Sequence, residues 1–276
     1  MRTWFITGMS RGLGFALAKA VLAQGDTVVG TVRGDAPDLD PGRGTLYVLP
    51  LDLADGAAIG ATVERAFALA GTIDVIVNNA GYGLLGAVEK ATDAEVARLF
   101  EVDVFGPFRV IRAALPRLRT QGSGHIVNIT SIAGRAPGPG SGLYAAAKHA
   151  LEGLSAALAQ EVAPLGLKVT AVAPGAFRTD FLSTHSIRKS AADDGAYAAS
   201  VGRSAVAFDA MAGRQLGDPD RAAQAIIAAV RAERPPLHLL LGTDALRRAR
   251  EKLDAVIEEM GRWEDVTRGT DFPAAD

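Results

Sequence analysis

Cysteine is absent from this chain of 276 residues. Its absence excludes disulfide bonds, thiol nucleophiles and metal sites with cysteine ligands. An excess of basic charge is also missing, because 29 lysines and arginines are matched by 31 acidic residues. This balance excludes the strongly basic surface expected of a nucleic-acid-binding protein. The four histidines lack the paired spacing of metal ligands, so we assign no metal.

Long apolar runs are missing as well. None comes near the ~20 residues that a membrane-spanning helix needs. The N-terminus enters an apolar segment at Thr3, which leaves no room for a charged stretch followed by a cleavable apolar one. From these absences we expect a soluble cytoplasmic protein with no membrane span.

Short β-rich segments alternate with longer segments of helical periodicity. We expect strands at 2–7, 27–33, 45–50, 73–77, 124–130, 167–173 and 237–241. We expect helices at 12–24, 55–70, 92–119, 143–164, 219–233 and 244–260. The alternation implies repeated βαβ units. It predicts an α/β fold of the Rossmann-like type, with a doubly wound, seven-stranded parallel sheet and helices on both faces.

No linker interrupts this pattern, so we expect a single domain over residues 1–276. Residues 176–217 differ from the rest in their mixed polarity and weak periodicity. A loop of that length is typical of a functional lid or a disordered stretch, and we expect it to be the substrate loop. Residues 243–276 are expected to form a C-terminal helix followed by a polar tail.

A glycine-rich turn, Thr7–Gly14, joins the first expected strand to the first expected helix. Glycines let the chain turn tightly and let a phosphate approach the backbone, where helix N-terminal amides favour negative charge. A plain tight turn would explain three glycines equally simply, but the position between an apolar strand and an amphipathic helix favours phosphate binding. The residues expected to bind a dinucleotide here are Gly8, Ser10, Arg11, Gly12, Leu13 and Gly14.

The second expected strand ends at Arg33 and has no carboxylate there. A site that prefers NAD would place a carboxylate near this point to bond the adenosine ribose. Arg33 and Arg11 could instead face a ribose 2′-phosphate, whose oxygens suit a guanidinium group. Both arginines could also be solvated surface charge. We expect NADP(H) to be preferred over NAD(H).

Tyr144 and Lys148 lie four residues apart at the start of an expected helix, so they share a face. An ammonium near a phenol favours the phenolate and is expected to lower the pKa of Tyr144. Ser131 closes the preceding strand, where its hydroxyl could hold a substrate oxygen. A tyrosine and a lysine at this spacing are usually an ordinary helix face, and their significance here depends on the accompanying motifs.

Those motifs resemble the short-chain dehydrogenase/reductase family, in its single-domain members of about this length. The resemblance covers residues 1 to about 245, and the motifs occur in the family's order and at its distances. The matching segments are Thr7–Gly14, Leu51–Leu53, Asn78–Gly81, Ser131, Tyr144 with Lys148, and Pro174-Gly175 with Thr179.

The resemblance implies a cofactor site at the matching positions. Asp52 would bond the adenine amine, although it could be a solvated aspartate, and Asn78–Gly81 would shape the cofactor floor, although it could be a plain turn. Thr179 and the backbone near Phe177 would hold the nicotinamide carboxamide. Besides the glycine turn and Arg33, the cofactor-binding residues would be Asp52, Leu53, Asn79, Ala80, Gly81, Tyr144, Lys148, Pro174, Gly175, Phe177 and Thr179.

The resemblance also implies the catalytic roles. Tyr144 would donate a proton to the carbonyl oxygen during reduction, and Ser131 would position that oxygen. Lys148 would bind the nicotinamide ribose while lowering the pKa of Tyr144. The family pattern has an asparagine where this chain has Asp103. An aspartate could pair with Lys148 and weaken its effect on Tyr144, so we expect activity to survive with an altered pH profile.

These residues favour an enzyme that interconverts a small-molecule carbonyl and an alcohol by hydride transfer. The apolar side chains in the 176–217 loop and in the segment flanking Tyr144 favour a bulky hydrophobic substrate. One alternative is a non-catalytic NADP(H)-binding regulatory protein, which would have no need of the acid. Another is an epimerase or dehydratase acting on a nucleotide-linked sugar, which normally carries an additional C-terminal domain. A homodimer or homotetramer is expected, because the fourth and fifth helices of relatives pair across a two-fold axis.

Overall fold

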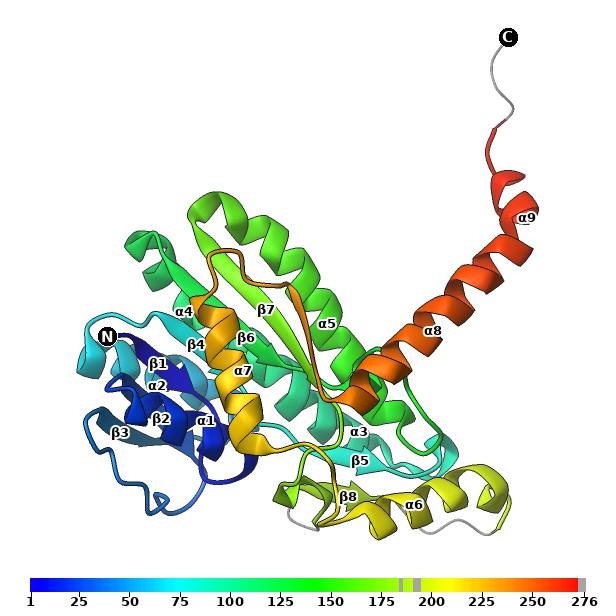
Figure 1. The fold of residues 1–276 in the computed structure, drawn as a ribbon, viewed down its shortest axis with the longest axis horizontal. Coiled ribbons are helices and arrows are strands. Elements are labelled where there is room, and N and C mark those ends of the chain that lie inside the picture. Colours follow the sequence, from blue (N-terminus) through cyan, green and yellow to red (C-terminus); the bar gives the residue numbers. More distant parts are fainter. Residues whose placement is uncertain (184–185, 191–194, 273–276) are drawn as a thin grey trace.

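The computed structural model describes residues 1–183, 186–190 and 195–272 (Figure 1). Part of the expected substrate loop at 176–217, including His185, therefore lies outside the described residues. Among the helices of the described ranges, none combines the length and the apolar character that a bilayer crossing requires.

The central sheet has seven parallel strands in the order β3-β2-β1-β4-β6-β7-β9, which confirms the predicted fold class. From β1 the chain adds β2 and β3 on one side of the sheet, and it then crosses over to add β4 and the later strands on the other side. The reversal in strand order therefore lies between β1 and β4. Ligands bind parallel sheets of this kind at the carboxyl ends of the strands next to such a reversal. The strands are β1 Thr3–Ile6, β2 Thr27–Val32, β3 Thr45–Pro50, β4 Val75–Asn78, β6 Gly124–Ile129, β7 Leu167–Pro174 and β9 His238–Leu241.

Helices cover both faces of the sheet and give it two cores. α1 (Gly12–Ala23) and α7 (Pro219–Arg231) pack on one face. α2 (Gly56–Ala70), α4 (Gly106–Gln121) and α5 (Gly142–Val162) pack on the other. Successive side chains of a strand point to opposite faces. Within β1, Trp4 and Ile6 accordingly belong to the first core and Phe5 to the second.

The prediction of one continuous helix over residues 92–119 is wrong. These residues form α3 (Asp93–Phe100), a π-helical turn (Glu101–Phe105) and α4. A capping box begins α3, because the Thr92 hydroxyl accepts from Glu95 N and the Glu95 carboxylate accepts from Thr92 N. A π turn inserts one extra residue per turn and often marks a functional position. This turn contains Asp103.

The expected substrate loop and polar tail both contain regular structure. β8 (Ile187–Lys189) pairs in parallel with β5 (Gly83–Leu85), and α6 (Arg203–Met211) follows. The C-terminal region forms α8 (Thr243–Arg262) and α9 (Glu264–Arg268), so the tail is helical where we expected none. In Figure 1, α8 and α9 extend away from the sheet and its covering helices.

Candidate active site

The turn between β1 and α1 is held in place by Asn79. Its side-chain amide donates to the carbonyl oxygens of Thr7 and Gly8, both at 2.9 Å. Gly8 has a φ of 69°, which only glycine adopts readily. A Cβ on Gly14 would lie 2.4 Å from Asn79 Nδ2, so this contact requires glycine. The end of β4 therefore fixes the shape of the glycine turn.

The first turn of α1 is open to an anion. Its N-cap residue, Arg11, makes no side-chain hydrogen bond to the helix, and the first turn contains no acidic residue. The N-terminal amides of a helix need partners from outside it, and their dipole favours negative charge. The donors at this turn therefore fit a phosphate group. Thr179 closes the far side, because a Cβ on Gly12 would lie 3.7 Å from Thr179 Cβ.

The two candidate arginines of the cofactor site differ in their surroundings. Arg33 follows the end of β2 and is exposed. Arg11 is half-buried, and its guanidinium donates to Ser186 Oγ at 3.0 Å. Asp52, after β3, accepts from Ala54 N at 3.0 Å and faces the Arg98 guanidinium at 3.9 Å. Arg11 thus joins the glycine turn to the segment that precedes β8.

Tyr144, Ser131 and Lys148 meet at the carboxyl end of β6. The Ser131 side chain lies close enough to the Tyr144 hydroxyl to lower the pKa of Tyr144. Ser131 Oγ also accepts from Ala133 N at 3.1 Å, which fixes its position at the start of a short 3-10 turn. Lys148 Nζ lies 5.7 Å from the centre of the Tyr144 ring. The structure therefore brings together the three residues that the sequence singled out.

Asp103 makes an ion pair with Lys148. Asp103 Oδ2 and Lys148 Nζ are 3.0 Å apart, and Asp103 is completely buried. Lys148 Nζ also donates to the Ile129 carbonyl at 3.2 Å, and Asp103 Oδ1 accepts from Tyr82 N at 3.0 Å. A Cβ on Gly81 would lie 2.9 Å from Asp103 Oδ2, so Gly81 leaves room for the carboxylate.

Burial raises the pKa of Tyr144 above its ordinary value of 10.0. Lys148 acts in the opposite direction, and the Asp103 carboxylate adds to the increase. The expected lowering of the Tyr144 pKa is therefore wrong for this arrangement of protein groups, because a desolvated phenol resists losing its proton. Burial disfavours the Lys148 ammonium, but Asp103 and Tyr144 outweigh it and raise the pKa of Lys148.

Comparison with known proteins agrees with this geometry. The family model described as short chain dehydrogenase matches residues 2–190. The chain belongs to the short-chain dehydrogenase family. Oxidoreductase BOA17 of Botryotinia fuckeliana is 34% identical to it over 270 residues, which cover 96% of this chain and 98% of the relative. The dehydrogenase described here is thus an oxidoreductase.

Two solved structures of the family extend the comparison. A short-chain dehydrogenase from Streptomyces avermitilis is 42% identical, has a TM-score of 0.88, and matches over 98% of both chains. A metagenomic short-chain oxidoreductase in complex with NADP is 28% identical, with a TM-score of 0.67, over 87% of this chain and 96% of its own. Both support the Rossmann-like fold.

Asp244, in the first turn of α8, fixes the loop after β7 and was missed by the sequence analysis. Its Oδ2 accepts from Ala176 N at 2.9 Å. A Cβ on Gly175 would lie 2.2 Å from Asp244 Oδ1, so the motif glycine makes room for this carboxylate. The partners lie 68 residues apart, and only an acidic residue at the start of a helix hinted at the contact. In the dehydrogenase, α8 therefore supports the segment expected to hold the carboxamide.

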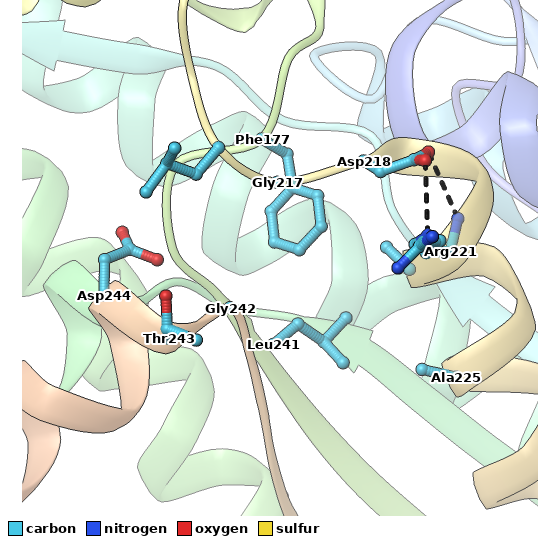
Figure 2. Close-up of a pocket in the computed structure, with 11 residues that line it drawn as sticks. Phe177, Gly217, Asp218, Arg221, Ala225, Leu241, Gly242, Thr243 and Asp244 are labelled. Carbon is cyan, nitrogen blue, oxygen red and sulfur yellow. Dashed lines mark hydrogen bonds and ion pairs between the residues drawn. The ribbon is translucent and has the colours of Figure 1, made fainter.

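Phe177 points away from the cluster around Tyr144. Its ring lines a pocket of about 280 Å³ between the starts of α7 and α8, together with Leu241 and Asp244 (Figure 2). The Phe177 side chain packs against the core under α1 and α7. Tyr82, by contrast, packs in the cluster that contains Tyr144.

A second pocket, of about 270 Å³, adjoins the start of α5. Its wall comes from Gly86–Glu89, from Gly138–Gly140 and Gly142, and from Tyr197 and Val201 of the segment before α6. The polar side chains of Glu89 and Tyr197 bond to each other across it. Elsewhere on α5, Tyr144 contacts Phe181, with ring centres 5.9 Å apart.

Replacing Asp244 with alanine is expected to weaken cofactor binding, because the Ala176 amide loses its charged acceptor and the loop after β7 loosens. The dissociation constant for NADPH, measured by fluorescence titration, should rise roughly tenfold. Asp254→Ala on the exposed part of α8 is the control and should leave the constant unchanged. Equal affinities for the wild type and Asp244→Ala would show that this bond does not position the loop.

Proposed function

We propose that this dehydrogenase interconverts a ketone or aldehyde and an alcohol with NADP(H), and that Tyr144 is its acid and base. The observation that carries the proposal is that Ser131 lies beside the Tyr144 hydroxyl, while Lys148 Nζ lies 5.7 Å from the centre of the same ring. A pure NADP(H)-binding protein would have no need of this arrangement.

The cofactor, when bound, supplies or accepts the hydride. Ser131 holds the substrate oxygen while the Tyr144 hydroxyl gives it a proton during reduction and takes one during oxidation. Lys148 directs one donor to Asp103 and one to Ile129, which leaves its third for a ribose hydroxyl. The raised pKa of Tyr144 keeps the phenol protonated at neutral pH, the state that reduction needs.

Replacing Tyr144 with phenylalanine is expected to remove the acid while keeping the ring and its contact with Phe181. Turnover should fall about 10²–10⁴-fold, as general acid–base catalysis typically contributes this much. NADPH affinity should stay within a few fold of the wild type, measured by the same fluorescence titration. Turnover that survives in Tyr144→Phe would overturn the proposal, and it would leave a role in cofactor binding alone.

Replacing Asp103 with asparagine is expected to move the pH profile to lower pH. The carboxylate raises the pKa of Tyr144, so its neutral replacement is expected to lower that pKa over the pH range in which Lys148 keeps its proton. The rate of oxidation, which needs the phenolate, should start to rise at a lower pH than in the wild type. The rate of reduction, which needs the protonated phenol, should start to fall at a lower pH. Rates in both directions across the alkaline range test this. Asp93→Asn, on exposed α3, is the control, and superimposable curves for Asp103→Asn and the wild type would exclude the role.

NADP(H) is the proposed cofactor because the exposed residue directly after β2 is Arg33 and not a carboxylate. An exposed guanidinium at this place suits a ribose 2′-phosphate. The metagenomic relative solved with NADP supports the same choice. Arg11, which already bonds Ser186, would add a second positive charge near the phosphates.

A bulky hydrophobic ketone or secondary alcohol is the proposed substrate. The pocket beside α5 is bordered by Ala87, Val88, Pro139 and Val201, and its two polar residues bond to each other. Phe181 and Tyr82 add aromatic surface next to Tyr144. Such a wall favours apolar groups, because it offers a polar substrate few partners.

A panel of ketones assayed with NADPH and with NADH tests both the proposed cofactor and the proposed substrate class. Large apolar ketones with NADPH should give the highest kcat/KM, followed at the nicotinamide absorbance. Small polar ketones should be at least about tenfold poorer, because each buried CH₂ contributes about 0.8 kcal/mol. A preference for NADH would contradict the role of Arg33, and equal use of small polar ketones would contradict the substrate class.

We further propose that the chain acts as a single domain in the cytoplasm and associates through α4 and α5 as a homodimer or homotetramer. Phe105, in the π turn before α4, and Phe108 in α4 are large apolar side chains exposed at 46% and 40%. Arg109 and Arg112 stack on these two rings. Exposed aromatic and arginine side chains of this kind are enriched in protein interfaces.

A further inference from the structure

The C-terminal helix leaves the body of the protein after its first two turns. Ala245 and Ala249 are buried against Ile132 and Ala136. From residue 250 to residue 272 every side chain is exposed except that of Val256, which is half-buried. Figure 1 shows α8 and α9 extending into space beyond the rest of the chain. A helix gains most of its stability by packing an apolar face, and this part of α8 has none packed.

An apolar stripe nevertheless continues along the exposed part of α8. It consists of Leu246, Leu253, Val256, Ile257, Met260 and Trp263, and is called the α8 stripe below. Spacings of three and four residues place these side chains on one face, which also contains the buried Ala245 and Ala249. Leu253, Ile257 and Met260 are exposed at 61%, 65% and 66%. Contiguous exposed apolar surface of this kind marks an interaction site.

The charges beside the α8 stripe are distributed unevenly along the helix. Three ion pairs form within α8 and α9, namely Arg247–Glu251, Arg262–Glu258 and Arg268–Glu264. Of the other charged side chains of α8 and α9, five are exposed and form no ion pair with any described residue. Two are basic and stand in the first half of the stripe, and three are acidic and stand at or beyond its middle. In chain order they are Arg250, Lys252, Asp254, Glu259 and Asp265.

We propose that the α8 stripe binds the α8 stripe of a second copy of this chain, with the two helices antiparallel about a two-fold axis. In that arrangement the basic first half of each helix lies beside the acidic second half of the other. The surface is thus complementary to itself, as a closed two-fold contact requires. The contact buries both stripes and gives the unpaired charges partners. It shares no residue with the surface on α4 and α5.

Two substitutions on opposite faces of α8 test the role of the stripe in the full-length protein. Ile257→Glu places a charge in the centre of the stripe, and Ala255→Glu places the same charge on the opposite face. Sedimentation velocity should show a particle of half the wild-type mass for Ile257→Glu, with an association constant at least about tenfold lower. Ala255→Glu should keep the wild-type mass. Equal masses for all three proteins would overturn the proposal.

Charge reversal tests the partner and its orientation. Arg250→Glu with Lys252→Glu makes all five of these exposed charges acidic, and Asp254→Lys with Glu259→Lys makes four of them basic and leaves Asp265 acidic. Each double variant alone should sediment at half the wild-type mass, because like charges then face each other. Mixing the two should restore the wild-type mass, and so should one chain that carries all four changes. Failure of the mixture to associate would overturn the antiparallel contact.

A lipid surface is the alternative occupant that the same variants can detect. Flotation with phosphatidylcholine vesicles should leave the wild type unbound. Vesicle binding that Ile257→Glu abolishes and Ala255→Glu retains would assign the α8 stripe to a membrane and overturn the proposed pairing. Turnover is not the readout in any of these tests, because none of the substituted residues belongs to the proposed active site.

Discussion

The buried ammonium of Lys148 connects the parts of the chain that form the proposed active site. Removing such a charge from water costs several kcal/mol, which a buried partner and further hydrogen bonds must offset. Asp103 and the Ile129 carbonyl supply them. Asp103 is itself held by the Tyr82 amide, so the segment after β4, the π turn, the end of β6 and α5 all meet at this charge. Tyr144 occupies a fixed place beside it.

Two opposing effects of this arrangement decide how the phenol behaves. The ammonium favours the phenolate, whereas burial and the second charge, on Asp103, favour the protonated form. An ion pair in a buried site acts on a neighbour more weakly than its cation alone, because the two charges partly cancel. Asp103 thus stabilises Lys148 in its charged state and at the same time reduces the influence of Lys148 on Tyr144.

Local patterns predicted much of this molecule. The alternation of apolar segments predicted the seven strands of the sheet. The sequence did not predict the π turn at Glu101–Phe105, because its residues continue the helical periodicity on either side. The hydrogen bond from Ala176 N to Asp244 was not predicted either, because its partners are distant in the chain. The direction of the Tyr144 pKa shift depends on burial, which only tertiary packing determines.

Direct titration of the Tyr144 hydroxyl tests this account at its centre. Carbon-13 labelling of the four tyrosine rings, with Tyr144 assigned through the Tyr144→Phe spectrum, allows its ionisation to be followed by NMR in the cofactor-free protein. The account predicts a Tyr144 pKa above 10.0 in the wild type, and a lower value in Asp103→Asn. A wild-type Tyr144 that titrates below 10.0, or one whose pKa is unmoved by Asp103→Asn, would contradict it.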